Sequence, residues 1–180
     1  MPALTERIAP ALLAFALAVA APAALTAQDS PFGGFQHDSS QPIEITSDTL
    51  EVQQAQQRAI FTGDVIAGQG TLRLRAQRVE VYYDAEDTSG DTGAIKRMRA
   101  EGGVLLSNGA ETARGAWGEY DVVAGTMRMG GSVVLTQGEN AISGESMLIN
   151  LNEGTGRMEG GGGQGGRVKS VFRPGSTPQN

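Results

Sequence analysis

The chain has 180 residues, 39% of them hydrophobic, and a net charge of −6 at neutral pH. This length suits a single domain, and so acidic a chain is a poor partner for nucleic acid or for an anionic membrane surface. Because cysteine is absent, disulfides, thiolate metal sites and cysteine nucleophiles are excluded together.

The first 27 residues are typical of a secretory signal. Arg7 stands in a short leader, an Ala/Leu-rich apolar run follows, and the run closes on the small residue Ala27. We therefore expect a signal peptide over residues 1–27, cleaved near Ala27–Gln28. An exported chain without disulfides suits a bacterial periplasm.

The alternative for this segment is a retained membrane anchor. Pro10 and Pro22 leave only residues 11–21 uninterrupted, whereas a bilayer span needs about 20 apolar residues. The sequence therefore favours the cleaved signal.

A strand pattern dominates the chain from Phe61 onward. Apolar and polar residues alternate around Leu72 and Leu74, and again around Val79 and Val81. Alternation places every second side chain on one face of a strand. No segment after the signal shows a convincing helical period, so we predict an all-β protein.

The strands belong to a repeat of 29 residues. At this shift Gly102 matches Gly131 and Gly109 matches Gly138, and a third copy opens at Gly156. An earlier copy starts near Gly63 at a shift of 39, and its ten extra residues fit a turn-rich loop over residues 85–93. About three copies of short antiparallel strands indicate a sandwich, a jelly roll or a β-solenoid.

The flanks of the repeated region differ from it in composition. Residues 28–41 are rich in Gly, Ser and Pro and are expected to be flexible, and the repeats occupy 42–159. Residues 160–166 form a Gly-rich hinge. Residues 167–173 are expected to form a C-terminal edge strand, and 174–180 a disordered tail.

Alternation divides the strands into an apolar face and a polar face. The opposite, polar face carries Glu44, Arg73, Arg75, Glu80, Asp121 and Arg128, and we expect Arg73, Arg75 and Arg78 to be solvated there rather than to bind phosphate. The apolar face carries Ile43, Ile45, Leu50, Val52, Phe61, Gly63, Val65, Leu72, Leu74, Ala76, Val79, Val81, Tyr83, Val104, Leu106, Tyr120, Val122, Met127, Met129, Val133, Leu135, Met147, Ile149 and Leu151.

The apolar face allows two interpretations. An ordinary packed core accounts for many of its residues. However, the set is aliphatic, contains methionine and has little aromatic bulk, as a groove for a flexible apolar ligand would. The residues alone leave the packed core and the groove open.

Little in the sequence indicates catalysis. The single histidine, His37, stands in the Gly/Ser/Pro-rich segment, so neither a Ser–His–Asp arrangement nor a histidine metal site is expected. Asp48, Asp64, Asp84 and Asp121 lie at expected strand ends and turns, where Asp is common for structural reasons. A carboxylate pair of the glycosidase kind is disfavoured.

The chain resembles the OstA-like family over residues 42–174. The resemblance is carried by "PIEITSDTLEV" (42–52), "FTGDVIAGQGTLRLRAQRVEV" (61–81), "GEYD" (118–121), "GSVVLTQGENAISGESMLIN" (131–150) and "RVKSVFRP" (167–174).

The resemblance implies a folded-over β-jelly roll, open along one side, whose apolar interior binds the acyl chains of lipopolysaccharide. Such proteins stack end to end by edge-strand pairing into a periplasmic bridge between the membranes, with LptC-like and LptD-like partners, and need no cofactor, metal or catalytic residue. It implies edge-strand assembly through Ile43, Ile45, Val168 and Val171. It implies lipid contact by Val65, Leu72, Leu74, Val79, Val81, Tyr83, Val104, Leu106, Tyr120, Val122, Met129, Val133, Leu135, Met147 and Ile149.

Two alternative functions stay open. One is an LptC-like component of the same pathway, anchored in the inner membrane through a retained N-terminal helix. The other is a structural β-repeat protein with a closed core and no ligand.

Overall fold

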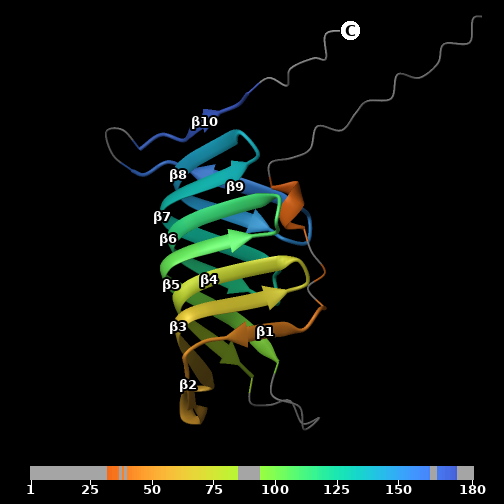
Figure 1. Ribbon diagram of the computed structural model, residues 1–180, viewed down its shortest axis with the longest axis vertical. Coiled ribbons are helices and arrows are strands. Elements are labelled where there is room, and N and C mark those ends of the chain that lie inside the picture. The colour runs from red at the N-terminus through yellow and green to blue at the C-terminus, as the bar shows by residue number, and fades with distance from the viewer. Residues whose placement is uncertain (1–31, 37, 39, 85–93, 163–165, 174–180) are drawn as a thin grey trace, which may run out of the picture.

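The computed structural model describes residues 32–36, 38, 40–84, 94–162 and 166–173. The signal segment, His37, the loop 85–93 and the tail 174–180 lie outside these residues. The elements, shown in Figure 1, are η1 (Gly33–Phe35), β1 (Ile43–Thr46), β2 (Thr49–Gln53), η2 (Gln54–Gln56), β3 (Arg58–Gln69), β4 (Leu72–Tyr83), β5 (Ile95–Ser107), β6 (Glu111–Asp121), β7 (Thr126–Gln137), β8 (Asn140–Asn150), β9 (Thr155–Glu159) and β10 (Lys169–Val171).

All ten strands of the described residues belong to one antiparallel sheet. Consecutive strands pair from β3 to β8, and each edge carries two short strands. At one edge β1 and β2 pair with different halves of β3, and at the other β10 and β9 pair with different halves of β8. Figure 1 shows the strands following one another along the long axis, from β2 to β10. The predicted all-β, open architecture is confirmed.

A line of β-bulges crosses the sheet at one level. The register shifts lie at matching places in successive strand pairs. Gly63, Gly102 and Gly131 occupy them with φ of 86°, 86° and 79°, a backbone conformation that glycine adopts without steric cost. These are the glycines that the repeat aligns, so the repeat is a repeat of bulges. A bulge bends its strand, so β3, β5 and β7, which carry these glycines, are long and bent strands. The sequence suggested separate short strands instead.

The bulges divide the sheet into two arms. The first arm contains β1, β10 and the halves of β3–β8 beside the turns at Gly70, Gly109 and Gly138. The second arm contains β2, β9 and the other halves. Side chains from both arms meet in one hydrophobic cluster, so the sheet is folded over on itself as the jelly-roll prediction requires.

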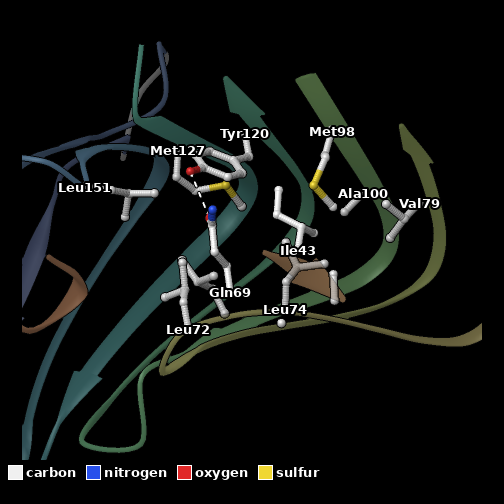
Figure 2. Close-up of a pocket in the computed structure, with 13 residues that line it drawn as sticks. Ile43, Gln69, Leu72, Leu74, Val79, Met98, Ala100, Tyr120, Met127 and Leu151 are labelled. Carbon is white, nitrogen blue, oxygen red and sulfur yellow. Dashed lines mark hydrogen bonds between the residues drawn. The ribbon is translucent and has the colours of Figure 1, made fainter. Parts of the chain in front are cut away.

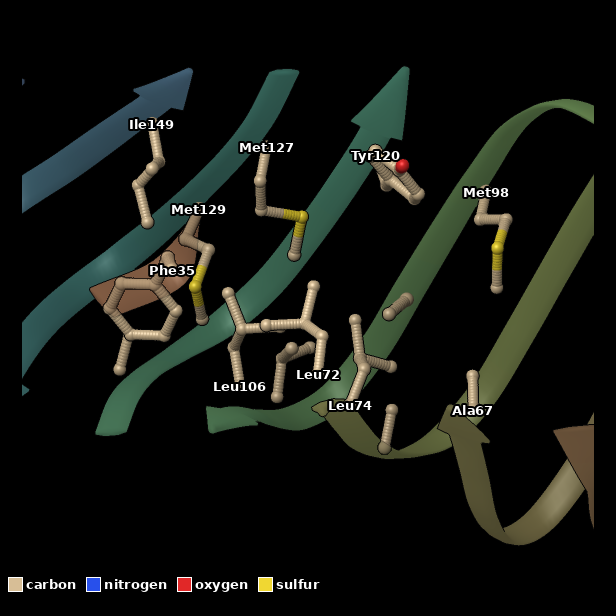
Figure 3. Packing of buried hydrophobic residues seen from close by; sticks show 14 of the residues in the cluster. Phe35, Ala67, Leu72, Leu74, Met98, Leu106, Tyr120, Met127, Met129 and Ile149 are labelled. Carbon is tan, nitrogen blue, oxygen red and sulfur yellow. The ribbon is translucent and has the colours of Figure 1, made fainter. Parts of the chain in front are cut away.

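The apolar face predicted from alternation is the inner face of this fold. Val65, Val79, Met129, Val133 and Ile149 have no exposed surface, and Figure 3 shows side chains of both arms packed together. Leu50 and Val52 differ, since each is 56% exposed. They share the face of their strand partners Phe61 and Ala59, but on the edge strand β2 they stay largely exposed to solvent.

The outer face carries charged side chains that are largely paired in the second arm. Glu80 accepts hydrogen bonds from Tyr82 Oη at 2.6 Å and from Arg78 Nη2 at 2.7 Å, and it forms an ion pair with Arg58 at 3.3 Å. The Tyr82 hydrogen bond, followed by that of Arg78, lowers the pKa of Glu80. Arg73 and Arg75 are exposed on the first arm, which confirms the predicted outer placement of these arginines.

Candidate functional site

The interior between the arms contains the candidate site. Its residues come from alternate positions of every long strand, because successive side chains of a strand point to opposite faces of the sheet. Most of the residues expected to contact lipid are buried there, while Tyr83 and Val122 are half-buried. The structure thus brings the predicted set together on one face, whereas contact with a ligand stays a prediction.

The middle of the interior is closely packed. Its cavity measures about 30 Å³ and is lined by residues of both arms, among them Leu74, Val79 and Met127 (Figure 2). A water molecule needs roughly 10–15 Å³ by this measure, so the cavity has room for very few atoms. In this part of the interior the packed-core interpretation is correct.

A polar contact joins the two arms across this cavity. Tyr120, on β6 in the second arm, donates from its hydroxyl to Oε1 of Gln69, on β3 in the first arm, at 3.1 Å (Figure 2). Gln69 Nε2 donates in turn to the carbonyl oxygen of Gln41 at 2.9 Å. Gln69 is 5% exposed, and burial raises the pKa of Tyr120. The contact joins the two arms near their free ends, since Gln69 is the last residue of β3 and Tyr120 the last but one of β6.

The end of the interior beside β1 and β2 is open. A groove of about 620 Å³ lies there. It is mainly apolar, and its polar lining residues are Gln54 and Asp84, of which Asp84 is paired with Lys96. Its apolar lining residues are Ile43, Ile45, Val52, Ala59, Phe61, Val81, Tyr83 and Ile95. At this end the apolar face lines an open groove, and its occupation by a flexible apolar ligand stays a prediction.

Several inner residues were not predicted. Ala59 and Ile95 line the groove, and Met98, the match of Met127 in the repeat, is a buried core residue that the repeat could have identified. Phe35 is buried completely in the core although it stands in the segment expected to be flexible. Glu111 is 2% exposed and accepts hydrogen bonds from the amides of Asn108 and Gln137.

The two predicted edge strands lie at the two ends of the sheet path. In β1, Ile43 and Ile45 are half-buried and also line the groove. Near β10, Val168 is 41% exposed and Val171 is 61% exposed. β10 itself is shorter than the predicted strand, since only Lys169–Val171 pair with β8.

The described residues offer few other kinds of site. Within them, no three His, Asp or Glu side chains are grouped so that they could hold a metal ion. No helix in the same part of the chain is long and apolar enough to cross a membrane.

Comparison with known proteins identifies the family of this fold. Residues 44–155 match the family described as "LptA/(LptD N-terminal domain) LPS transport protein". The chain is 34% identical over 185 residues to "Uncharacterized protein R00383" of Rhizobium meliloti (strain 1021), with 99% of this chain and 98% of the relative covered.

A solved structure has the same fold. It is the crystal structure of LptH, the LptA homologous periplasmic component of the conserved lipopolysaccharide transport device from Pseudomonas aeruginosa, with a TM-score of 0.64 and 20% sequence identity. The match covers 76% of this chain and 99% of the LptH chain. Since the family match spans more than half of the sequence, the chain belongs to the LptA/LptD N-terminal domain family of lipopolysaccharide transport proteins.

Proposed function

We propose that the protein carries lipopolysaccharide across the periplasm from the inner to the outer membrane, with the acyl chains of lipid A held between its arms. The observation that carries this proposal is the open apolar groove, because a closed β-repeat would not leave Phe61 and Val81 beside a space of about 620 Å³. In this function the chain has no catalytic role and needs no cofactor.

The free energy of binding would come mainly from the acyl chains. Each methylene that leaves water contributes about 0.8 kcal/mol, so one saturated tail in the groove supplies several kcal/mol. The net charge of −6 disfavours a strong attraction for the anionic headgroup. We therefore expect affinity to follow the length and number of the tails.

The deeper inner-face residues would contact the tails after the arms separate. Val133, Leu135 and Ile149 are at most 1% exposed, and the cavity elsewhere in the interior measures only about 30 Å³. We propose that tails first contact the groove and reach these residues as the arms move apart.

The bridge would form by edge-strand pairing. In this proposal β10 of one copy pairs with β1 of the next, and the terminal copies pair in the same way with LptC-like and LptD-like partners at the inner and outer membranes. Strand addition of this kind draws its affinity from main-chain hydrogen bonds, and both β1 and β10 stand at sheet edges.

The two other functions make different predictions. The packed middle of the interior favours a structural β-repeat without a ligand, and such a protein would take up no lipid. An LptC-like protein would keep its N-terminal segment. Native mass spectrometry of protein isolated from its own periplasm separates all three, because it reports both the mature N-terminus and any lipopolysaccharide adduct.

Photo-crosslinking tests the proposed site directly. Phe61 lines the groove, whereas the next residue, Thr62, is exposed on the outer face. A benzoylphenylalanine at position 61 should label lipopolysaccharide, and the same residue at position 62 should not. Equal labelling at the two positions would show that the groove is not the binding site.

A further inference from the structure

The described part of the N-terminal segment, residues 32–36, lies against the interior at its β8–β9 end. Phe35 has no exposed surface and belongs to the core cluster, and Phe32 packs against the same cluster. Figure 3 shows the Phe35 ring beside Met129 and Ile149. The segment contributes a single 3-10 turn, Gly33–Phe35, and not a strand. Its two rings therefore enter the core from outside the sheet.

The repeats show that the sheet is shaped to receive Phe32. At the shift of 29 residues, Met98 matches Met127, and Met127 matches Gly156. Both methionines are buried on the inner face, and Gly156 pairs with the inner-face residue Ile149. A Cβ atom on Gly156 would overlap the ring of Phe32. The third repeat thus lacks the inward side chain of the other two copies, and Phe32 occupies its place.

Two further glycines permit the close approach of the segment. A Cβ atom on Gly154 would lie 3.1 Å from Cα of Gly33, and one on Gly34 would overlap the carboxylate of Glu111. Gln36 Nε2 also donates a hydrogen bond to the carbonyl oxygen of Asn152 at 2.8 Å. Glycines on both sides of the contact therefore allow a backbone approach that a larger side chain would prevent, which indicates a specific contact.

We propose that the β8–β9 end of the interior is a second acyl-chain site, and that Phe32 and Phe35 fill it until a tail of the cargo displaces them. This inference rests on the proposed function. Met129 and Met147, which are buried at this end, suit a site with exchangeable occupants because methionine adapts its shape to different apolar groups. The segment makes no strand pair among the described residues, so it can leave while the sheet stays intact.

A reversible crosslink tests this inference. A Cβ atom on Gly154 would lie 3.4 Å from Cβ of Gln36, close to the spacing of about 3.8 Å in disulfides. The double variant Gln36→Cys/Gly154→Cys can form one disulfide only, since the chain has no cysteine. Gly154 has a φ of 65°, so a cysteine there is strained, but the oxidised and reduced forms share that strain.

The measurement is the affinity of the full mature chain for purified lipopolysaccharide, by displacement of a dansyl-labelled undecanoic acid. The reduced form should bind as the parent does. The oxidised form should bind about tenfold more weakly, as expected when the competent conformation becomes a minor population. Equal affinity of the two forms would overturn the inference, because the segment would then not stand in the way of the ligand.

A second variant supports the same test without a crosslink. Phe32→Ala should raise the affinity for lipopolysaccharide several-fold, whereas Phe172→Ala, which truncates an aromatic side chain that is 61% exposed, should not change it. An unchanged affinity in Phe32→Ala counts against the inference. If the parent and the reduced double variant both fail to bind, the proposed function itself is wrong and the inference falls with it.

Discussion

At the scale of single residues, the hydroxyl of Tyr120 has a measurable role in joining the arms. Replacing Tyr120 by Phe removes the hydrogen bond to Gln69 and keeps the ring. We expect the free energy of unfolding to fall by about 1 kcal/mol at neutral pH, the usual net contribution of such a bond.

The same variant should change the alkaline limb of the stability curve. Burial raises the pKa of Tyr120, so the stability that depends on its neutral form is fully present below the ordinary tyrosine pKa of about 10 and declines as the pH rises further. Urea denaturation across this range should show a shallower decline in Tyr120→Phe. An unchanged slope would mean that Tyr120 does not titrate with unfolding.

Tyr82→Phe is the matched control, because it removes a hydroxyl from the outer face instead. The Tyr82 hydroxyl lowers the pKa of Glu80, so this bond contributes stability above the ordinary glutamate pKa of about 4.3. That contribution is lost as the pH falls through the lowered value. Tyr82→Phe should therefore lower the free energy of unfolding at neutral pH. It should also make the loss of stability with falling pH shallower.

At the scale of elements, the bulges offer a matched pair of glycines. Gly102 and Gly103 have φ of 86° and 79°, but a Cβ atom on Gly102 would lie 2.7 Å from Cβ of Gln77, whereas one on Gly103 would meet nothing within 4 Å. Alanine at either position costs about 1–2 kcal/mol for the left-handed backbone, and Gly102→Ala adds about 1–3 kcal/mol for the overlap. Chemical denaturation should rank Gly102→Ala below Gly103→Ala, and equal losses would show that the sheet yields freely at the bulge.

Sequence alone was sufficient for the all-β class and for the inner face of the long strands, but not for the lengths of the strands. The period of two is a local property, so residues such as Val79 and Ile149 could be assigned to the inner face without knowledge of their neighbours. The repeat also placed Gly63 and Gly102 at equivalent positions. Their role as bulges was not predicted, because a register shift depends on the partner strand.

Other parts of the site depend on contacts between distant segments. Phe35 stands among Gly, Ser and Pro residues, and only its packing beside residues such as Met129 of β7 and Ile149 of β8 makes it a core residue. Whether the apolar face is packed or open depends on the separation of the arms, which differs between the cavity near Leu74 and the groove near Phe61. No pattern along the chain encodes that separation.

At the scale of the whole molecule, the two edges predict head-to-tail association. Proline cannot donate a main-chain hydrogen bond, so Val168→Pro or Val171→Pro should reduce the oligomers seen by light scattering. The circular dichroism spectrum and lipopolysaccharide binding of the single chain should persist. The control is Val123→Pro, in the β6–β7 turn, where the side chain is 80% exposed.

The charges at the edges extend this prediction. Glu44 in β1 and Lys169 in β10 carry opposite charges, so added salt should weaken the association of the parent somewhat. Oligomers of the proline variants that match those of the parent would show that the β10 edge is not the contact.

The line of bulges also determines how the capacity of the interior can change. Because the bulges lie at one level across β3–β8, we expect one arm to rotate as a unit about the line that they form. An arm of about five residues extends roughly 17 Å from that axis, so a rotation of about 10° moves its free end by roughly 3 Å. The interior would then widen along its whole length at once. Its volume would therefore depend on the movement of all the strands of one arm together.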